Sequence, residues 1–357
     1  VRALPCLKIL DSPRFGWRGI MIDESRHFIG KPTVLKILDA MASLKLNRFH
    51  WHLTDGSGWR LEIKRFPELT TVGAVGDCSD PKRPAQFYTQ SDVREILAYA
   101  RERHIMVIPE IEMPAHSTSA MIAYPHLSCT GKPEFQYCAG NDEVLRFLEQ
   151  VLDETLELFD APYIHIGGDE CPKDLWAKCP KCQARKKAHG LKDENELQSW
   201  MIRHFDRYLS SKGRRLVGWD SITEGGLAEG AVVMAYRDWD KAGAAVRHGN
   251  DVVIAIHTAF YLDYEQFAVP DGYRYFQRHV NSCESLVSFN PVAGIPAEKR
   301  GKVLGIQGCS WGEVCYDGKD AEWKLFPRAA VIAERAWSPE PKVGWESFKR
   351  KAPQIRA

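Results

Sequence analysis

Tyr163 to Glu170 (YIHIGGDE) combines a short apolar run, two glycines and two adjacent carboxylates. The apolar half predicts a buried strand, and the glycines permit backbone conformations that side chains forbid and let a ligand approach the main chain. Side chains of an extended segment alternate between opposite sides, so Asp169 and Glu170 are expected not to face each other and to have separate tasks. For so short a motif, a strand that ends in a solvated acidic turn is the alternative.

Seven further segments resemble this one, because each is an apolar run that ends in polar or aromatic residues. Eight strands that alternate with helices predict an α/β fold with a parallel sheet, closed into a (β/α)8 TIM barrel. An open doubly wound sheet is the alternative, but the glycine-rich loop that it normally carries after its first strand is missing. The expected strands are Arg18 to Asp23, Arg48 to Asp55, Ile105 to Met113, Tyr163 to Glu170, Arg215 to Asp220, Val232 to Tyr236, Asp251 to Ile256 and Val303 to Trp311.

The segments between these strands show helical periodicity. In Lys31 to Leu46, for example, apolar residues recur every three or four positions. Such spacing places the apolar side chains on one face of a helix, where they can cover the barrel. The expected helices are Lys31 to Leu46, Ser91 to Arg103, Asn141 to Phe159, Lys192 to Ser211, Asp240 to His248 and Ala321 to Trp337.

Length and charge exclude several classes of protein. A chain of 357 residues suits one barrel of ~250 residues with insertions. The net charge of +1 gives no electrostatic case for nucleic acid or an anionic membrane surface, and no apolar run approaches the ~18 residues of a membrane span. The chain begins without Met or a signal-peptide pattern, so we expect a processed or trimmed N-terminus.

The polar residues at the strand ends form the candidate site. In barrels of this kind the active site lies at the C-terminal ends of the strands, so these side chains are expected to meet there. A single histidine is more often a satisfied core residue, but a whole set at one end of a barrel favours catalysis. The set comprises Arg18, Asp23, His50, His52, Asp55, Glu110, Glu112, His116, His165, Asp169, Glu170, Trp219, Asp220, Tyr236, Tyr261, Asp263, Trp311 and Glu313.

With these motifs the chain resembles the catalytic barrel of family 20 glycoside hydrolases, the β-N-acetylhexosaminidases. The resemblance runs through the whole chain in order. The matching segments are Arg18-Gly19 with Arg26-His27-Phe28, His50 to Asp55, Pro109 to His116, His165 to Glu170, Gly218 to Asp220, Tyr261 to Tyr264, Gly305 to Gln307, Trp311 to Glu313, Arg328 to Ala330 and Ala333 to Trp337.

The resemblance implies exo-hydrolysis of terminal β-linked GlcNAc or GalNAc with retention and without a cofactor. In this substrate-assisted reaction the 2-acetamido oxygen attacks the anomeric carbon and forms an oxazolinium ion. Glu170 is then the general acid, which requires a raised pKa, and Asp169 orients the acetamido N–H. The resemblance also implies that His116 and Asp55 form a hydrogen-bonded pair that tunes Glu170, and that Tyr261 donates a hydrogen bond to the acetamido oxygen. The residues implied in substrate binding are Arg18, Trp219, Tyr236, Asp263, Trp311, Glu313 and His165.

The chain also departs from the family pattern. Tyr236 stands where the family usually has a third tryptophan, which can reshape the acetamido pocket. Residues 1–12 are expected to be a linker left from a preceding domain, residues 13–357 the barrel, and the location secreted or periplasmic. Two alternatives stay open: a member that releases a disaccharide or a modified sugar, and a sugar-binding protein without catalysis.

The ten cysteines suggest two further features. Cys129 and Cys138 bracket a short loop and suit a disulfide in an exported protein. Cys171, Cys179 and Cys182, with His189 as a fourth candidate, have the spacing of a structural zinc knuckle. Free or disulfide-bonded thiols are the alternative for this second group. The expected chemistry itself needs no metal.

Overall fold

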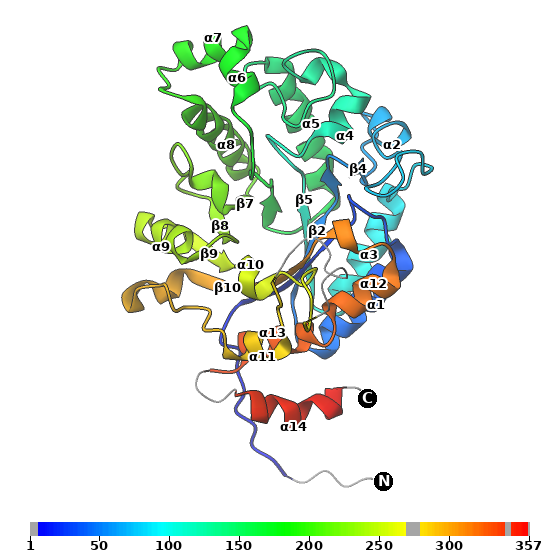
Figure 1. Ribbon diagram of the computed structural model, residues 1–357, viewed down its shortest axis with the longest axis vertical. Coiled ribbons are helices and arrows are strands. Elements are labelled where there is room, and N and C mark those ends of the chain that lie inside the picture. The colour runs from blue at the N-terminus through cyan, green and yellow to red at the C-terminus, as the bar shows by residue number, and fades with distance from the viewer. Residues whose placement is uncertain (1–5, 269–278, 340–343, 356–357) are drawn as a thin grey trace.

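The structure is a computed structural model that describes residues 6–268, 279–339 and 344–355. Eight parallel strands close into a barrel in the order β1-β10-β9-β8-β7-β6-β5-β2, and helices surround it (Figure 1). This confirms the predicted (β/α)8 fold. The barrel strands are β1 (Trp17–Asp23), β2 (Arg48–His52), β5 (Met106–Glu110), β6 (Tyr163–His165), β7 (Arg215–Trp219), β8 (Val232–Ala235), β9 (Asp251–Ile254) and β10 (Val303–Ser310).

The register of the strands lines up four polar residues at one level of the barrel. Asp23 is paired with His52, His52 with Glu110, and Glu110 with His165. Each of these residues closes its own strand, so the row lies at the C-terminal ends of four adjacent strands. The parallel register therefore places charged groups where a barrel active site is expected.

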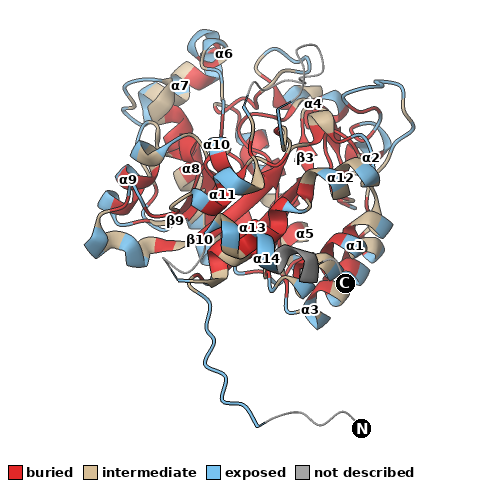
Figure 2. Cartoon of the chain, turned by 60° about the horizontal axis from the view of Figure 1, so that its bottom comes forward, coloured by how far each residue is buried: buried red, intermediate tan, exposed pale blue. Residues whose placement is uncertain are grey.

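The helices bury their apolar faces against the strands, as Figure 2 shows by the red interior and the pale blue outer surface. Several begin at a residue whose side chain accepts a backbone N–H, for example Asn141 and Asp193, which explains their starting points. The main covering helices are α1 (Lys31–Ser43), α3 (Gln90–Glu102), α5 (Asp142–Leu158), α8 (Glu194–Ser211), α9 (Trp239–His248) and α13 (Arg328–Trp337).

Two predictions about the elements were wrong in detail. The segment expected to form one helix up to Trp337 forms two, α12 (Gly318–Leu325) and α13, because Pro327 between them offers no N–H to continue the first. Most strands also end before their polar termini, so that Asp55, Asp169 and Asp220 lie beyond the barrel strands. These candidates are therefore held by the segments that follow the barrel strands.

Smaller elements fill the connections. After β6 the chain forms α6 (Asp174–Lys178) and α7 (Pro180–Ala188) before α8 begins, and this insertion projects at the top left of Figure 1. The remaining ones are β3 (Thr54–Asp55), β4 (Gly58–Trp59), α2 (Glu68–Thr71), α4 (Thr118–Ala123), η1 (Pro125–Leu127), η2 (Asp220–Thr223), α10 (His257–Phe260), α11 (Cys283–Ser288), η3 (Ala297–Lys302), η4 (Gly312–Val314) and α14 (Trp345–Ile355).

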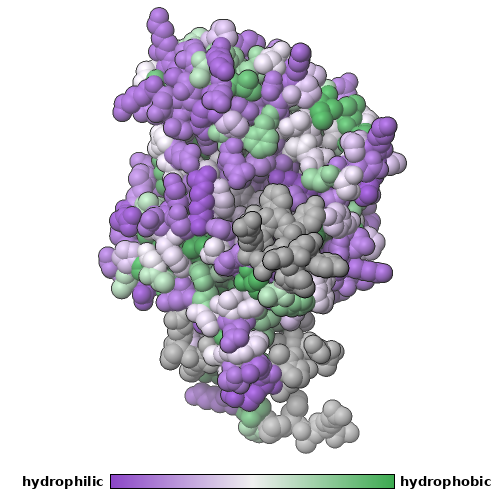
Figure 3. All heavy atoms as spheres, in the orientation of Figure 1, coloured by the Kyte–Doolittle hydropathy of each residue, from purple (hydrophilic) through white to green (hydrophobic). Residues whose placement is uncertain are grey.

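Residues 6–12 form neither helix nor strand, are exposed, and extend away from the barrel (Figure 1). That residues 1–12 are a linker stays a prediction, and residues 1–5 and 356–357 lie outside the described part. Within the described residues, every helix is too short or too polar to cross a bilayer. The face in Figure 3 is largely hydrophilic, with small separate hydrophobic patches.

Candidate active site

A cavity of about 430 Å³ collects most of the predicted site residues. Asp169, Glu170 and His116 line it together with aromatic side chains, and Arg26, Arg237, His257 and Tyr264 add groups that had no assigned role in the sequence-based prediction. The predicted residues that line the cavity are His116, Asp169, Glu170, Tyr236, Tyr261, Asp263, Trp311 and Glu313. Asp55, Trp219, His165 and Arg18 do not line it.

The loop after β6 presents the two adjacent carboxylates in an unusual backbone conformation. Gly167 has φ 67°, and Glu170 has φ 49°, a left-handed value that is uncommon for a residue with a side chain. A Cβ on Gly167 would lie 1.7 Å from Glu112 Oε2, so only glycine fits beside this buried carboxyl group. The glycine thus allows the sharp turn that brings Asp169 and Glu170 to the cavity.

Asp169 and Glu170 differ in environment, as their expected separate tasks require. Asp169 is buried, and this burial raises its pKa. The Glu170 side chain is 60% exposed, and its contact with the His116 ring lowers its pKa. The expectation that the pKa of Glu170 is raised is therefore wrong for the free protein, because a cationic partner and water stabilise its charged form.

His116 is the shared partner of both acids. Its Nε2 lies 3.6 Å from Asp169 Oδ2 and 3.5 Å from Glu170 Oε2, while its Nδ1 lies 3.1 Å from Asp55 Oδ1. Burial alone would lower the pKa of His116, but the Asp55 carboxylate and the two acids raise it to about 10. His116 also has φ 52°, so it shares the left-handed backbone of Glu170. The predicted pair of His116 and Asp55 is present beside Glu170.

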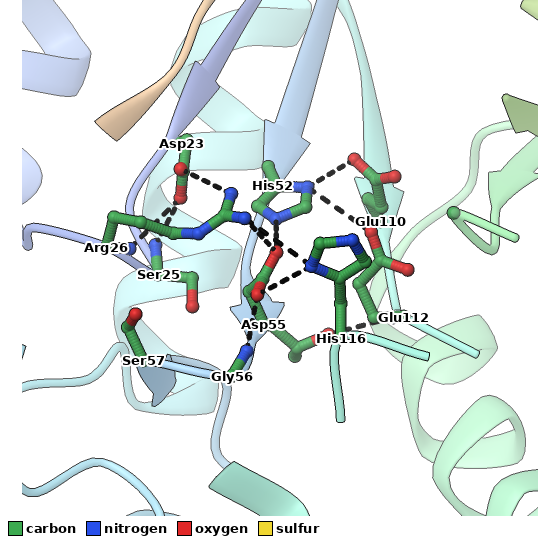
Figure 4. Close-up of polar contacts among 12 residues, drawn as sticks. Asp23, Ser25, Arg26, His52, Asp55, Gly56, Ser57, Glu110, Glu112 and His116 are labelled. Atoms are coloured by element: carbon green, nitrogen blue, oxygen red, sulfur yellow. Dashed lines mark hydrogen bonds and ion pairs between the residues drawn. The ribbon is translucent and has the colours of Figure 1, made fainter. Parts of the chain in front are cut away.

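A chain of buried charges continues from Asp55 into the barrel (Figure 4). Asp55 Oδ2 lies 3.1 Å from His52 Nε2, and His52 Nδ1 lies 2.5 Å from Glu110 Oε2. Glu110 in turn contacts His165 at 2.7 Å and accepts a hydrogen bond from Trp219 Nε1 at 2.8 Å. His165 is fully buried beneath the cavity, so its predicted contact with substrate is wrong; it supports the network instead.

Arg26 and Arg237 line the cavity, whereas Arg18 does not. Arg26 Nη2 lies 2.8 Å from Asp55 Oδ2, and its Nη1 lies 2.9 Å from Asp23 Oδ2 (Figure 4). Arg18 lies near the start of β1, at the opposite end of the barrel, where it donates to the carbonyl oxygens of Lys45 and Phe15. The predicted role of Arg18 in binding sugar is therefore wrong. Arg26 belongs to a segment that matched the family, and its place after the C-terminal end of the first expected strand is the sequence signal that could have identified it.

Aromatic rings form one wall of the cavity. Tyr236 and Tyr261 lie parallel with ring centres 6.5 Å apart, and Trp311 packs 5.9 Å from Tyr261. Trp219 does not line the cavity but lies behind it, 5.5 Å from Trp311 and 5.7 Å from Tyr236. The Tyr236 hydroxyl accepts a hydrogen bond from Arg237 Nε at 3.0 Å. The departure at position 236 thus adds an anchored hydroxyl to an apolar wall.

Two carboxyl groups provide polar contacts elsewhere in the cavity. Burial raises the pKa of Asp263 to about 7 and also raises the pKa of Glu313. Glu313 Oε1 lies 3.7 Å from Arg26 Nη2. Carboxyl groups of this kind can accept hydrogen bonds from sugar hydroxyls, and the guanidinium beside them can donate. Their predicted binding roles are compatible with this placement.

The cysteines group differently from the sequence-based prediction. None of the ten forms a disulfide, so the predicted pair of Cys129 and Cys138 is not present. Cys171 and His189 also lie outside the thiol group, since the Cys171 thiol donates to the Pro172 carbonyl and the His189 ring packs at a tilt against Trp200. The sulfur atoms that come together are those of Cys129, Cys138, Cys179 and Cys182. CxxC spacing identified two of these four; the other two come from a separate loop.

Comparison with known proteins agrees with this geometry. The profile described as "Glycosyl hydrolase family 20, catalytic domain" matches residues 15–340. A β-hexosaminidase of Porphyromonas gingivalis is 42% identical over 98% of this chain and 46% of its own length. One of Vibrio furnissii is 36% identical over 92% of this chain and 58% of its own. The chain thus spans about half the length of these relatives.

Solved structures share the fold. A GH20 exo-β-N-acetylglucosaminidase from Vibrio harveyi, in complex with N-acetylglucosamine, superposes with a TM-score of 0.89 at 33% identity, over 98% of this chain and 59% of that one. A β-N-acetylhexosaminidase from Bacteroides fragilis superposes with a TM-score of 0.87 at 35% identity, over 97% and 71%. The fold, the paired acids and the profile match lead to one conclusion: the chain belongs to glycosyl hydrolase family 20.

Proposed function

We propose that this protein is an exo-acting β-N-acetylhexosaminidase that removes terminal β-linked GlcNAc or GalNAc with retention. The observation that carries the proposal is the arrangement of Asp169 and Glu170, one buried and one accessible, around the single Nε2 atom of His116. The Vibrio harveyi neighbour is described as an exo-enzyme bound to N-acetylglucosamine, which supports the same substrate class here.

The two acids suit a substrate-assisted reaction. A retaining enzyme that supplies its own nucleophile needs carboxylates on both sides of the sugar, about 5 Å apart. Family 20 is a substrate-assisted exception to that rule, and Asp169 and Glu170, both within 3.6 Å of His116 Nε2, suit a division in which one acid serves the leaving group and the other the acetamido group. The nucleophile is then the acetamido oxygen of the substrate, whose bond to the anomeric carbon forms as the glycosidic bond breaks.

The protein groups move and stabilise protons and charge in this sequence. Glu170, which is accessible from the cavity, gives a proton to the leaving oxygen. Asp169 accepts a hydrogen bond from the acetamido N–H and stabilises the positive charge that develops there, aided by its buried position. The Glu170 carboxylate then takes a proton from the water that opens the oxazolinium ring at the anomeric carbon. This proton cycle uses no cofactor.

The free protein holds Glu170 in its charged form, so substrate binding must restore its proton. A sugar in the cavity removes water from the exposed side chain of Glu170, and desolvation raises the pKa of a carboxyl group. His116 opposes this change as long as it stays cationic. The acid is thus generated on binding and not carried permanently.

The test is turnover of aryl and alkyl β-N-acetylglucosaminides by the wild type, Asp169→Asn and Glu170→Gln. We expect Asp169→Asn to lose kcat on both substrates by at least ~100-fold. Glu170→Gln is expected to lose most on the alkyl glycoside, whose leaving group needs the proton. Glu157→Gln, on an exposed position of α5, serves as the matched control.

A thiazoline mimic of the oxazolinium ion separates the remaining possibilities. Strong competitive inhibition is expected for the proposed mechanism. An inert wild type that still binds the mimic would contradict catalysis and favour a sugar-binding protein. Turnover of disaccharide glycosides without turnover of monosaccharide ones would contradict the exo-action on single sugars. The secreted or periplasmic location stays a prediction.

A further inference from the structure

We infer that Cys129, Cys138, Cys179 and Cys182 hold one Zn²⁺ ion in a tetrahedral, purely structural site. The four sulfur atoms all lie within 4.8 Å of one another. Cys138 Sγ lies 3.7 Å from both Cys179 Sγ and Cys182 Sγ, and Cys129 Sγ lies 3.8 Å from Cys182 Sγ. Zinc–thiolate bonds of about 2.3 Å in a regular tetrahedron place sulfur atoms about 3.8 Å apart.

These distances do not fit disulfides. A disulfide joins two sulfur atoms at about 2.05 Å, and it leaves each cysteine with a single partner. Here Cys138 Sγ has two sulfur neighbours at equal distance, as expected for thiolate ligands of one tetrahedral metal ion. Cys138, Cys179 and Cys182 are buried and Cys129 is half-buried, so the ligands are shielded from solvent as in closed structural zinc sites.

The backbone around the thiols supports a site built for close approach. Cys179 precedes α7 and Cys182 lies in its first turn, so this pair occupies a knuckle between α6 and α7. The second pair comes from the loop after η1. A Cβ on Gly140 would lie 2.2 Å from the Lys181 carbonyl carbon and 2.3 Å from Cys182 N, so only glycine allows this loop to pack so closely against the start of α7.

The zinc site links the loop that follows η1 to the segment that follows β6, and both segments contact catalytic groups. Gln136 Nε2 donates to the Pro172 carbonyl at 3.1 Å, close behind Glu170, and Trp176 Nε1 donates to the Tyr137 carbonyl at 2.8 Å. Phe135, in the same loop, packs its ring 4.6 Å from the ring of His116. The ion would therefore act as a positioning element for His116 and Glu170, at a distance from the sugar.

Metal analysis of the full chain, purified without chelators, tests the assignment. We expect about one zinc per chain in the wild type and a loss of at least ~10-fold in Cys138→Ser and Cys182→Ser. Cys171→Ser is the matched control, because Cys171 lies in the same insertion but outside the cluster, and it should keep its zinc. In folded wild type, a mercurial thiol reagent should release the ion as four thiols react.

Several results would overturn the inference. They are a wild type without zinc, iron in place of zinc, two disulfides found by mass spectrometry, or zinc that is lost from Cys171→Ser. If the serine variants do not fold, the release titration and the spectrum of tetrahedral thiolate-bound Co²⁺ in exchanged wild type still decide. Metal content is measured without substrate, so an inactive protein that binds zinc would contradict the proposed function and leave the metal site standing.

Discussion

His116→Asn should move the pH dependence of the reaction upward by about one unit. Asparagine removes the positive charge while it tolerates the left-handed backbone at φ 52° and can still donate to Asp55. The charge matters because His116 Nε2 lies 3.5 Å from Glu170 Oε2. Glu170 is 60% exposed, so a water-like dielectric applies, and two unit charges at this distance then interact by about 1 kcal/mol, or roughly one pKa unit.

The sign of the shift follows from the role of Glu170. The cation favours the charged carboxylate, so its removal raises the pKa of Glu170, and the protonated acid persists to higher pH. The basic limb of the kcat/KM profile, measured with an alkyl glycoside, is expected to move upward by that amount. With a strongly activated aryl glycoside, which departs without a proton, the shift should shrink or vanish.

A matched control is available elsewhere in the chain. His104 is exposed and lies outside the cavity, and its φ of 56° gives it the same left-handed backbone conformation as His116. His104→Asn therefore makes the same chemical change away from the active site. It should leave the profile unchanged. A basic limb that stays in place or moves downward in His116→Asn, or that shifts equally in His104→Asn, would refute the electrostatic reasoning.

The remaining predictions concern the arginines and the glycine turn. Arg26→Lys should raise KM by ~10-fold or more, because lysine cannot bridge Asp23 and Asp55 as the planar guanidinium does. Arg18→Lys should lower Tm and leave KM unchanged. Equal kinetic effects of the two variants would contradict the placement of the two arginines. Gly167→Ala should lower the free energy of unfolding in urea by more than ~2 kcal/mol, because the new Cβ would clash with Glu112. Gly190→Ala has a similar φ of 62° and no atom near the new Cβ, so it should lower this free energy by only about 1 kcal/mol. An equal cost at both glycines would show that backbone conformation alone matters.

The strands and their order were predictable because each carries a local signal. Apolar runs such as Val232 to Ala235 have the length of a buried strand, and the polar residues that follow mark the end that faces the cavity. The motif around Asp169 and Glu170 located the centre of the site for the same reason. These features depend on residues adjacent in sequence, so spacing alone was enough.

The errors arose where the outcome depends on contacts between distant segments. The error over Arg18 is an exception: Arg18 opens the expected strand and Arg26 follows its C-terminal end, so strand direction alone favoured Arg26. The pKa of Glu170 depends on a histidine 54 positions away in the sequence, because Glu170 and His116 meet only in the folded chain. The thiol cluster likewise joins two loops whose proximity is a property of the fold.

The left-handed backbone conformation at His116 and Glu170 lowers the stability of the protein at two residues that its activity needs. Each residue with a side chain in this conformation costs about 1 kcal/mol, and here both are groups that the reaction uses. Glycine at either position would relieve that cost, but it would remove the acid at position 170 and the partner of both acids at position 116. Laboratory evolution that rewards heat resistance alone would therefore favour impaired variants at these two positions, so a useful screen must select for turnover and thermal survival together.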